Sequence, residues 1–194
     1  MEHHTAELTN KGDEMGLQIT FVFRTEANGY GKNDLDRYLT MQGEEKAVLL
    51  REALKKPEFD LILSSPAARA IRTAAIVGGI VNSQDVISVC ELYRPMNFDS
   101  SDTMTALLRQ YGNEAAAAIK RHIDEAAEDI LPSRQYEVLV AGHKVLLPIV
   151  AESLLQKVWR YSVTSQEIEK ITRCDFSEFR GLQIDGRGNV LFIE

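Results

Sequence analysis

The pattern of hydrophobic positions divides the chain into short apolar runs separated by longer segments with helical spacing. Most apolar runs are rich in β-branched residues and end at polar or turn-forming residues, which is typical of β-strands. The strands that we expect are 19–23, 59–63, 86–89, 137–141, 181–184 and 190–193. The last two flank the turn sequence 185–189, DGRGN, so they indicate a β-hairpin.

Helical patterns fill the intervals between the first five strands. Thr40 is expected to cap a helix whose apolar stripe includes Ala47, Leu50 and Leu54. Pro66 lies in the early helical position that proline favours. The other helices that we expect are 67–77, 103–111, 114–130 and 146–158. Strands alternating with helices predict a three-layer α/β/α sandwich around a mostly parallel central sheet.

The organisation of the chain is that of one domain. It has 194 residues, of which 44% are hydrophobic, and it shows no internal repeat and no linker. We expect a single domain over residues 17–194, preceded by a flexible, polar and acidic tail over residues 1–16. That tail lacks the hydrophobic stretch of a signal peptide, and the apolar runs are too short to cross a membrane. These features predict a cytoplasmic protein.

The net charge and the cysteine spacing limit the classes of ligand and partner that we expect. The formal net charge is −7, which argues against nonspecific binding of nucleic acid or of an anionic membrane. The two cysteines, Cys90 and Cys174, are far apart and have no metal-type spacing. We therefore expect no metal site and no cofactor. His122 follows Lys120-Arg121 and is expected on a helix surface.

Three loops that follow predicted strands carry side chains suited to binding an anion. They hold Arg24, Arg69 and His143. In a parallel sheet, the carboxyl ends of the strands meet at one edge, where ligands bind. The guanidinium fork of arginine bonds two oxygens at once, and a helix N-terminus such as that near Arg69 favours negative charge. The sequence therefore predicts a phosphate site formed by these three residues.

The segments 36–43, 60–70 and 138–143 resemble parts of the histidine phosphatase superfamily, and within it of the small bacterial phosphohistidine phosphatases. Segment 60–70, DLILSSPAARA, is similar to the family's strand, Ser-Pro turn and arginine-bearing helix. Segment 138–143, VLVAGH, is similar to its late strand ending in Gly-His, and segment 36–43, DRYLTMQG, to the opening of its first helix. The resemblance extends over residues 18–194 and implies a phosphoglycerate mutase-like fold and a phosphatase (hydrolase) ancestry.

The first strand departs from the family pattern. The family has Arg-His-Gly there, and its histidine is the nucleophile. When the chain is aligned on Glu26, Phe23, Arg24 and Thr25 replace these three residues. A guanidinium has no free lone pair for attack, so Arg24 is expected to bind phosphate but not to be phosphorylated. A shifted alignment places Thr25 at the histidine position and still leaves no histidine.

These observations lead to alternative functions. The first is a catalytically inactive pseudophosphatase that binds phosphate, a phosphorylated small molecule or a phosphorylated protein. The second is an active phosphohistidine phosphatase or phosphomonoesterase with an altered mechanism. Glu91 lies where some branches of the family have a general acid, so it is a candidate for that role or a surface residue. The third is a structural or regulatory protein that binds a partner and leaves the cleft empty.

Overall fold

The computed structural model describes residues 16–23, 25, 33–55, 58–93, 101–127, 135–161, 164–172 and 181–193. Residues 1–15, for which the sequence predicts a tail, lie outside this set, and so does Arg24. In the described part of the chain, the strands form one six-stranded sheet in the order β3-β2-β4-β1-β5-β6. Their bounds are β1 (Leu17–Phe23), β2 (Leu61–Ser64), β3 (Ile87–Ser88), β4 (Tyr136–Gly142), β5 (Gly181–Asp185) and β6 (Val190–Ile193).

The four strands β3, β2, β4 and β1 are parallel, and the β5–β6 hairpin pairs antiparallel with β1. The mostly parallel sheet expected from the sequence is therefore confirmed. The register pairs Phe23 with Gly142 and Ser64 with Ala141, so the carboxyl ends of β1, β4 and β2 lie at the same edge. This edge positions the candidate site.

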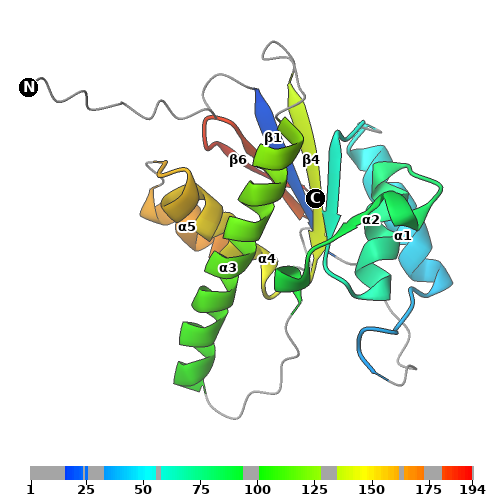
Figure 1. Ribbon diagram of the computed structural model, residues 1–194, viewed down its shortest axis with the longest axis horizontal. Helices are drawn as coiled ribbons and strands as arrows, with labels where there is room; N and C mark the ends of the chain where they lie inside the picture. Colours follow the sequence, from blue (N-terminus) through cyan, green and yellow to red (C-terminus); the bar gives the residue numbers. More distant parts are fainter. Residues whose placement is uncertain are drawn as a thin grey trace, which may run out of the picture.

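Helices cover both faces of the sheet (Figure 1). One face carries α1 (Met41–Ala53) and α2 (Ala68–Gly78), and the other carries α3 (Ser101–Ala127), α4 (Leu147–Ser153) and α5 (Ser165–Thr172). Short helical turns complete the described elements: η2 (Ser83–Asp85), η3 (Cys90–Leu92) and η4 (Leu154–Val158), the last with π-helical hydrogen bonding. The three-layer α/β/α arrangement agrees with the expectation from the sequence.

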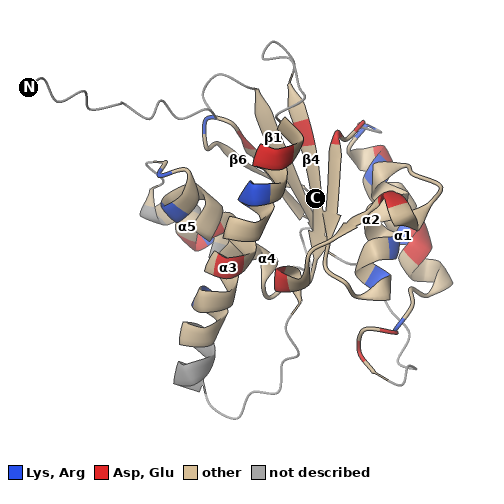
Figure 2. Ribbon diagram, viewed as in Figure 1, with Lys and Arg blue, Asp and Glu red and all other residues tan. Residues whose placement is uncertain are grey.

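The two layers of core follow from the alternation of side chains along each strand. In β4, Val138 and Val140 pack in the cluster beneath α3 and α4, whereas Leu139 and Ala141 pack in the cluster beneath α1 and α2. Charged side chains are concentrated on helices and connecting segments, and few lie on the strands (Figure 2). No helix in the described residues has the length and hydrophobicity needed to span a membrane.

Two helices differ from the prediction. Helix α3 is continuous over the point where we expected a break between residues 111 and 114. Gly112 does not end the helix there but allows α4 to approach, since a Cβ at Gly112 would lie 2.6 Å from Cγ2 of Ile149. Helix α5 was not predicted. The expected Thr40 cap is confirmed, because its Oγ1 accepts a hydrogen bond from the Gly43 amide at 3.0 Å.

Candidate functional site

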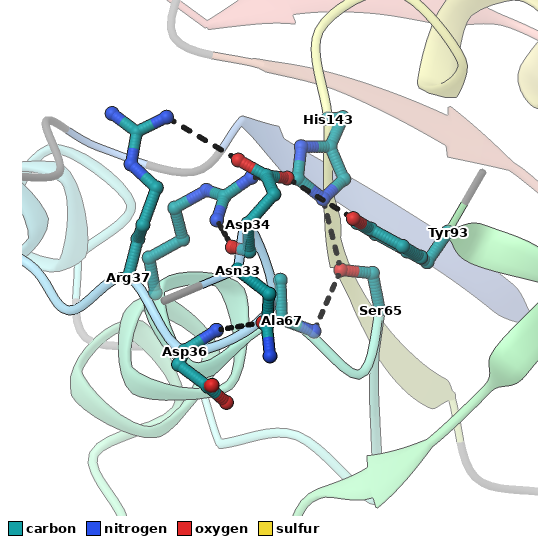
Figure 3. Close-up of polar contacts among 9 residues, drawn as sticks. Asn33, Asp34, Asp36, Arg37, Ser65, Ala67, Tyr93 and His143 are labelled. Atoms are coloured by element: carbon teal, nitrogen blue, oxygen red, sulfur yellow. Dashed lines mark hydrogen bonds and ion pairs between the residues drawn. The ribbon is translucent and has the colours of Figure 1, made fainter. Parts of the chain in front are cut away.

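A backbone hydrogen bond continues the pairing of β2 and β4 past their last residue pair, Ser64 and Ala141. The Ser65 amide donates to the Ala141 carbonyl at 3.0 Å, directly beyond the last residue pair of the two strands. Ser65 and His143 are therefore the first residues after neighbouring strands. The structure thus places two adjacent side chains, one from the Ser-Ser-Pro turn and one from the Gly-His segment, at the strand-end edge (Figure 3).

His143 is oriented by two neighbours. Its Nε2 lies 3.2 Å from Oγ of Ser65. That Oγ also accepts a hydrogen bond from the Ala67 amide at 3.4 Å, and the tautomer of His143 decides whether the Ser65 hydroxyl donates to the imidazole or accepts from it. The Tyr93 ring packs against the His143 ring in an edge-to-face arrangement, with centroids 5.6 Å apart. These contacts limit the rotation of the imidazole and hold it at the strand-end edge.

Arg69, in the first turn of α2, is the charged residue at the centre of the site. Its side chain is 2% exposed, which is exceptional for an arginine. Its Nη1 donates to the main-chain carbonyl of Asp34, and its Nη2 lies 2.5 Å from the Asp34 carboxylate. Its Nε is buried and has no hydrogen-bond partner among the described residues. The buried guanidinium is therefore paired by one residue of the loop that precedes α1.

Asp34 connects the two halves of the site. Its carboxylate accepts hydrogen bonds from Arg37 Nη1 at 3.2 Å and from the Tyr93 hydroxyl at 3.2 Å, in addition to that from Arg69. Partial burial alone would raise the pKa of Asp34, but the hydrogen bonds and positive charge of Arg69, with Arg37 and Tyr93, outweigh it and lower that pKa. Burial and the Asp34 charge raise the pKa of Tyr93. Asp34 is therefore ionised and Tyr93 protonated at neutral pH.

Of the residues predicted for the phosphate site, the structure brings Arg69 and His143 together through Asp34 and Tyr93. Arg24 lies outside the described residues, so its position stays a prediction. Its neighbour Thr25 is described: the Thr25 amide donates to Thr73 Oγ1 at 3.4 Å, and Thr73 Oγ1 donates to the Arg69 carbonyl at 2.8 Å. This chain of contacts places the end of β1 beside α2.

Glu91, the candidate general acid, lies on η3 and is about one-third exposed. Its Oε1 lies 3.8 Å from Nη2 of Arg121 on α3. The residue of this segment that contacts the Arg69–His143 region is Tyr93, two positions later. A catalytic role of Glu91 therefore stays a prediction.

Sequence reasoning missed three residues of the site: Asp34, Ser65 and Tyr93. Ser65 belongs to the Ser-Ser-Pro motif identified in the sequence. Because β2 and β4 are parallel neighbours, its proximity to His143 could have been predicted. Asp34 and Tyr93 lie in connecting segments without periodicity and carried no comparable signal. Among the described residues, no group of three or more histidine, cysteine or acidic side chains is arranged to hold a metal ion.

Residues 24–105 match the sequence model of the histidine phosphatase superfamily, branch 1. No curated protein sequence matches the chain. Similar solved structures include one described as the phosphohistidine phosphatase SixA of Agrobacterium tumefaciens, at 19% identity and a TM-score of 0.56, covering 91% of this chain and 97% of that one. A mycobacterial glucosyl-3-phosphoglycerate phosphatase in complex with inorganic phosphate has 16% identity and a TM-score of 0.55, covering 91% and 95% of the two chains.

A phosphoglycerate mutase from Plasmodium falciparum is similar at 16% identity with a TM-score of 0.52, covering 93% of this chain and 90% of that one. The mutase-like fold inferred from the three sequence segments is thus confirmed. The match over residues 24–105 also confirms the resemblance to the histidine phosphatase superfamily.

Proposed function

We propose that this chain, which has the fold of the histidine phosphatases, binds phosphate or a phosphorylated ligand at the edge formed by Arg69 and His143. The observation that carries the proposal is the burial of Arg69, whose side chain is 2% exposed beside the ends of the parallel strands. A buried arginine is costly unless its charge is paired with an anionic group, and binding an anion at a strand-end edge supplies such a group. The hydrogen bond of Arg69 to the Asp34 carboxylate supports the proposal, because this guanidinium already binds one anionic group.

The arrangement supplies more than one donor. Arg69 offers a planar fork that matches two oxygens of a phosphoryl group. His143 offers an imidazole held by Ser65 and Tyr93, and the N-terminus of α2 contributes a favourable field. Arg24, which follows Phe23 in the sequence, is proposed as a second guanidinium. The ligand would be a phosphorylated small molecule or protein side chain, bound without metal or cofactor.

We further propose that the chain does not turn over a phosphoryl ligand by the covalent route of the family. On the alignment with Glu26, Phe23 takes the place of the family's arginine, and Phe23 is a buried core residue, 7% exposed. Arg24 takes the place of the nucleophilic histidine, and a guanidinium cannot attack phosphorus. This reading makes the chain a pseudophosphatase.

One observation favours the alternative of an active phosphatase: Ser65 and His143 form a hydroxyl–imidazole pair of the kind that activates a nucleophile. Ser65, however, is fully buried at 0% exposure, and its Oγ also accepts from the Ala67 amide. A nucleophile has to reach the phosphorus atom of a bound ligand. The burial of Ser65 therefore favours its role in orienting His143.

The proposal is tested by titrating inorganic phosphate into the protein by calorimetry. Arg69→Ala is expected to abolish binding, and Arg69→Lys to weaken it about tenfold or more, because an ammonium lacks the fork. Arg72→Ala is the matched control, since Arg72 lies on the same helix but is exposed and paired with Glu44 at 2.8 Å. Unchanged affinity in folded Arg69 variants would place the binding site elsewhere.

A further inference from the structure

The contacts of Arg69 point to an internal competitor for the proposed phosphate site. Its Nη1 and Nη2 are both bonded to Asp34, one to the main-chain carbonyl and one to the carboxylate. Nη1 and Nη2 are two of the donors with which a guanidinium forms hydrogen bonds to a phosphoryl group. A ligand that uses this fork has to replace at least the carboxylate of Asp34.

The pair is asymmetric in burial. The Arg69 side chain is 2% exposed, whereas that of Asp34 is 45% exposed. Arg69 lies in the first turn of α2 and its side chain is buried, whereas the side chain of Asp34, in the loop before α1, is nearly half exposed. Asp34 is therefore the member of the pair that can move.

The surroundings give the displaced carboxylate another partner. Asp34 Oδ1 lies 3.2 Å from Arg37 Nη1, and Arg37 is three residues further along the same loop (Figure 3). Two hydrogen bonds of the loop do not involve the Asp34 carboxylate: the Asp36 amide donates to Asn33 Oδ1 at 3.0 Å within the loop, and the Ala68 amide at the start of α2 donates to the Leu35 carbonyl at 2.9 Å. A rotation of the Asp34 side chain toward Arg37 would free Nη2 of Arg69 without unfolding the loop.

We propose that Asp34 is an intramolecular ligand of the Arg69 guanidinium that an incoming phosphoryl group displaces, and that this displacement sets the affinity of the site. The inference rests on the proposed phosphate-binding function. In this proposal Asp34 has an inhibitory role. Its carboxylate compensates the buried charge of Arg69 until a stronger anion binds, and it then keeps its bond to Arg37. A dianionic phosphoryl group competes for the guanidinium better than a monoanion does, because its charge is larger at the same distance.

The test compares phosphate affinity in Asp34→Asn, Asp36→Asn and wild type. Asparagine keeps the shape and an acceptor oxygen but removes the competing charge. We expect Asp34→Asn to bind inorganic phosphate at least about fivefold more tightly, which corresponds to ~1 kcal/mol, the size of a half-exposed ion pair. Asp36→Asn is the control, since it makes the same charge change two residues away on an exposed side chain, and its effect is expected to be smaller than twofold.

The outcomes separate the two proposals. If Arg69→Ala abolishes binding while Asp34→Asn binds phosphate equally or more weakly, the phosphate site stands and the inhibitory role of Asp34 is wrong. If Arg69→Ala has no effect on binding, the phosphate site itself is wrong. If Asp34→Asn and Asp36→Asn tighten binding equally, the effect is one of net charge and the inference also fails.

A measurement on the wild type does not depend on how the variants fold. The carboxyl carbon of Asp34 is followed by NMR during pH titrations with and without saturating inorganic phosphate. Among the described residues, the charged and titratable groups facing this carboxylate are Arg69 on α2, Arg37 on its own loop and Tyr93 after η3, which packs on His143. Loss of Arg69 as a partner is expected to raise the titration midpoint. An unchanged or lower midpoint in the phosphate-bound protein would refute the displacement.

Discussion

The hydroxyl of Ser65 lies 3.2 Å from Nε2 of His143, and this contact joins the residues that directly follow β2 and β4. It depends on the register of the two strands, which pairs Ser64 with Ala141. Through this contact the buried Ser65 orients the His143 imidazole, which we propose binds phosphate.

Replacing Ser65 by alanine is therefore expected to weaken phosphate binding several-fold, since the imidazole loses one of the two contacts that orient it. The loss of one buried hydrogen bond is also expected to destabilise the protein by about 1 kcal/mol. Ser64→Ala is the matched control, because the Ser64 hydroxyl is equally buried but donates to the Ser65 carbonyl at 2.9 Å. Calorimetric titration and thermal unfolding of both variants would separate the two effects. Equal losses of affinity would argue against a specific role of Ser65.

A second prediction concerns the opposite end of β4. Burial raises the pKa of Glu137, and the nearby charge of Asp60 raises it further. Oε2 of Glu137 is buried without a hydrogen-bond partner among the described residues, and the Glu137 amide donates to Asp60 Oδ2 at 2.9 Å. A carboxyl whose pKa is higher in the folded state stabilises the fold fully below its unfolded pKa, and that stability is lost as pH rises through the folded pKa.

Glu137→Gln is therefore expected to raise the melting temperature by a few degrees at pH 7, because the amide carries no charge to bury. The gain is expected to disappear near pH 4, where the wild-type carboxyl is protonated. Glu58→Gln, at an exposed position nearby, is the control. A gain in stability that stays constant between pH 4 and pH 7 would contradict the assigned cause.

A third prediction follows from the contact of α3 with α4. Gly112→Ala would place a methyl group 2.6 Å from Cγ2 of Ile149, so the Ile149 side chain or one of the helices has to shift. The overpacking is expected to cost about 1–3 kcal/mol, offset in part by about 1 kcal/mol of helix propensity. Chemical denaturation would measure the net loss. The double variant with Ile149→Ala is expected to lose less than the sum of the two single changes; strict additivity would show that the contact is not the cause.

The sequence predicted the layers and the positions of most strands because hydrophobic alternation decides which face of a strand is buried. It predicted a break in α3 at Gly112, where the glycine serves close packing instead; a single sequence does not distinguish these two uses of glycine. The sequence also predicted that Arg69 and His143 lie at one edge of the sheet, because the carboxyl ends of parallel strands meet there. It did not reveal that Asp34 pairs with Arg69, because that contact depends on the path of an irregular loop.

The last prediction concerns the first strand. Restoring the family pattern with Phe23→Arg, Arg24→His and Thr25→Gly is expected to create detectable hydrolysis, provided that Arg69 and His143 still hold the phosphoryl group. Arg24→His alone is expected to be weaker, because Phe23 remains apolar and Thr25 keeps a side chain beside Thr73. Steady-state assays with a generic phosphate ester would rank the wild type, the single variant and the triple variant. Equal rates for all three would refute the assignment of the lost nucleophile to residue 24.

The most direct test of the central claim is a single-turnover reaction of the wild-type protein with phosphohistidine and with a generic phosphate ester. We expect no phosphorylated protein and no release of phosphate above the uncatalysed rate, although inorganic phosphate binds in an Arg69-dependent way. Wild-type turnover that is lost in His143→Ala but persists in Arg24→Ala would contradict the account, since it would show that another nucleophile operates in this site.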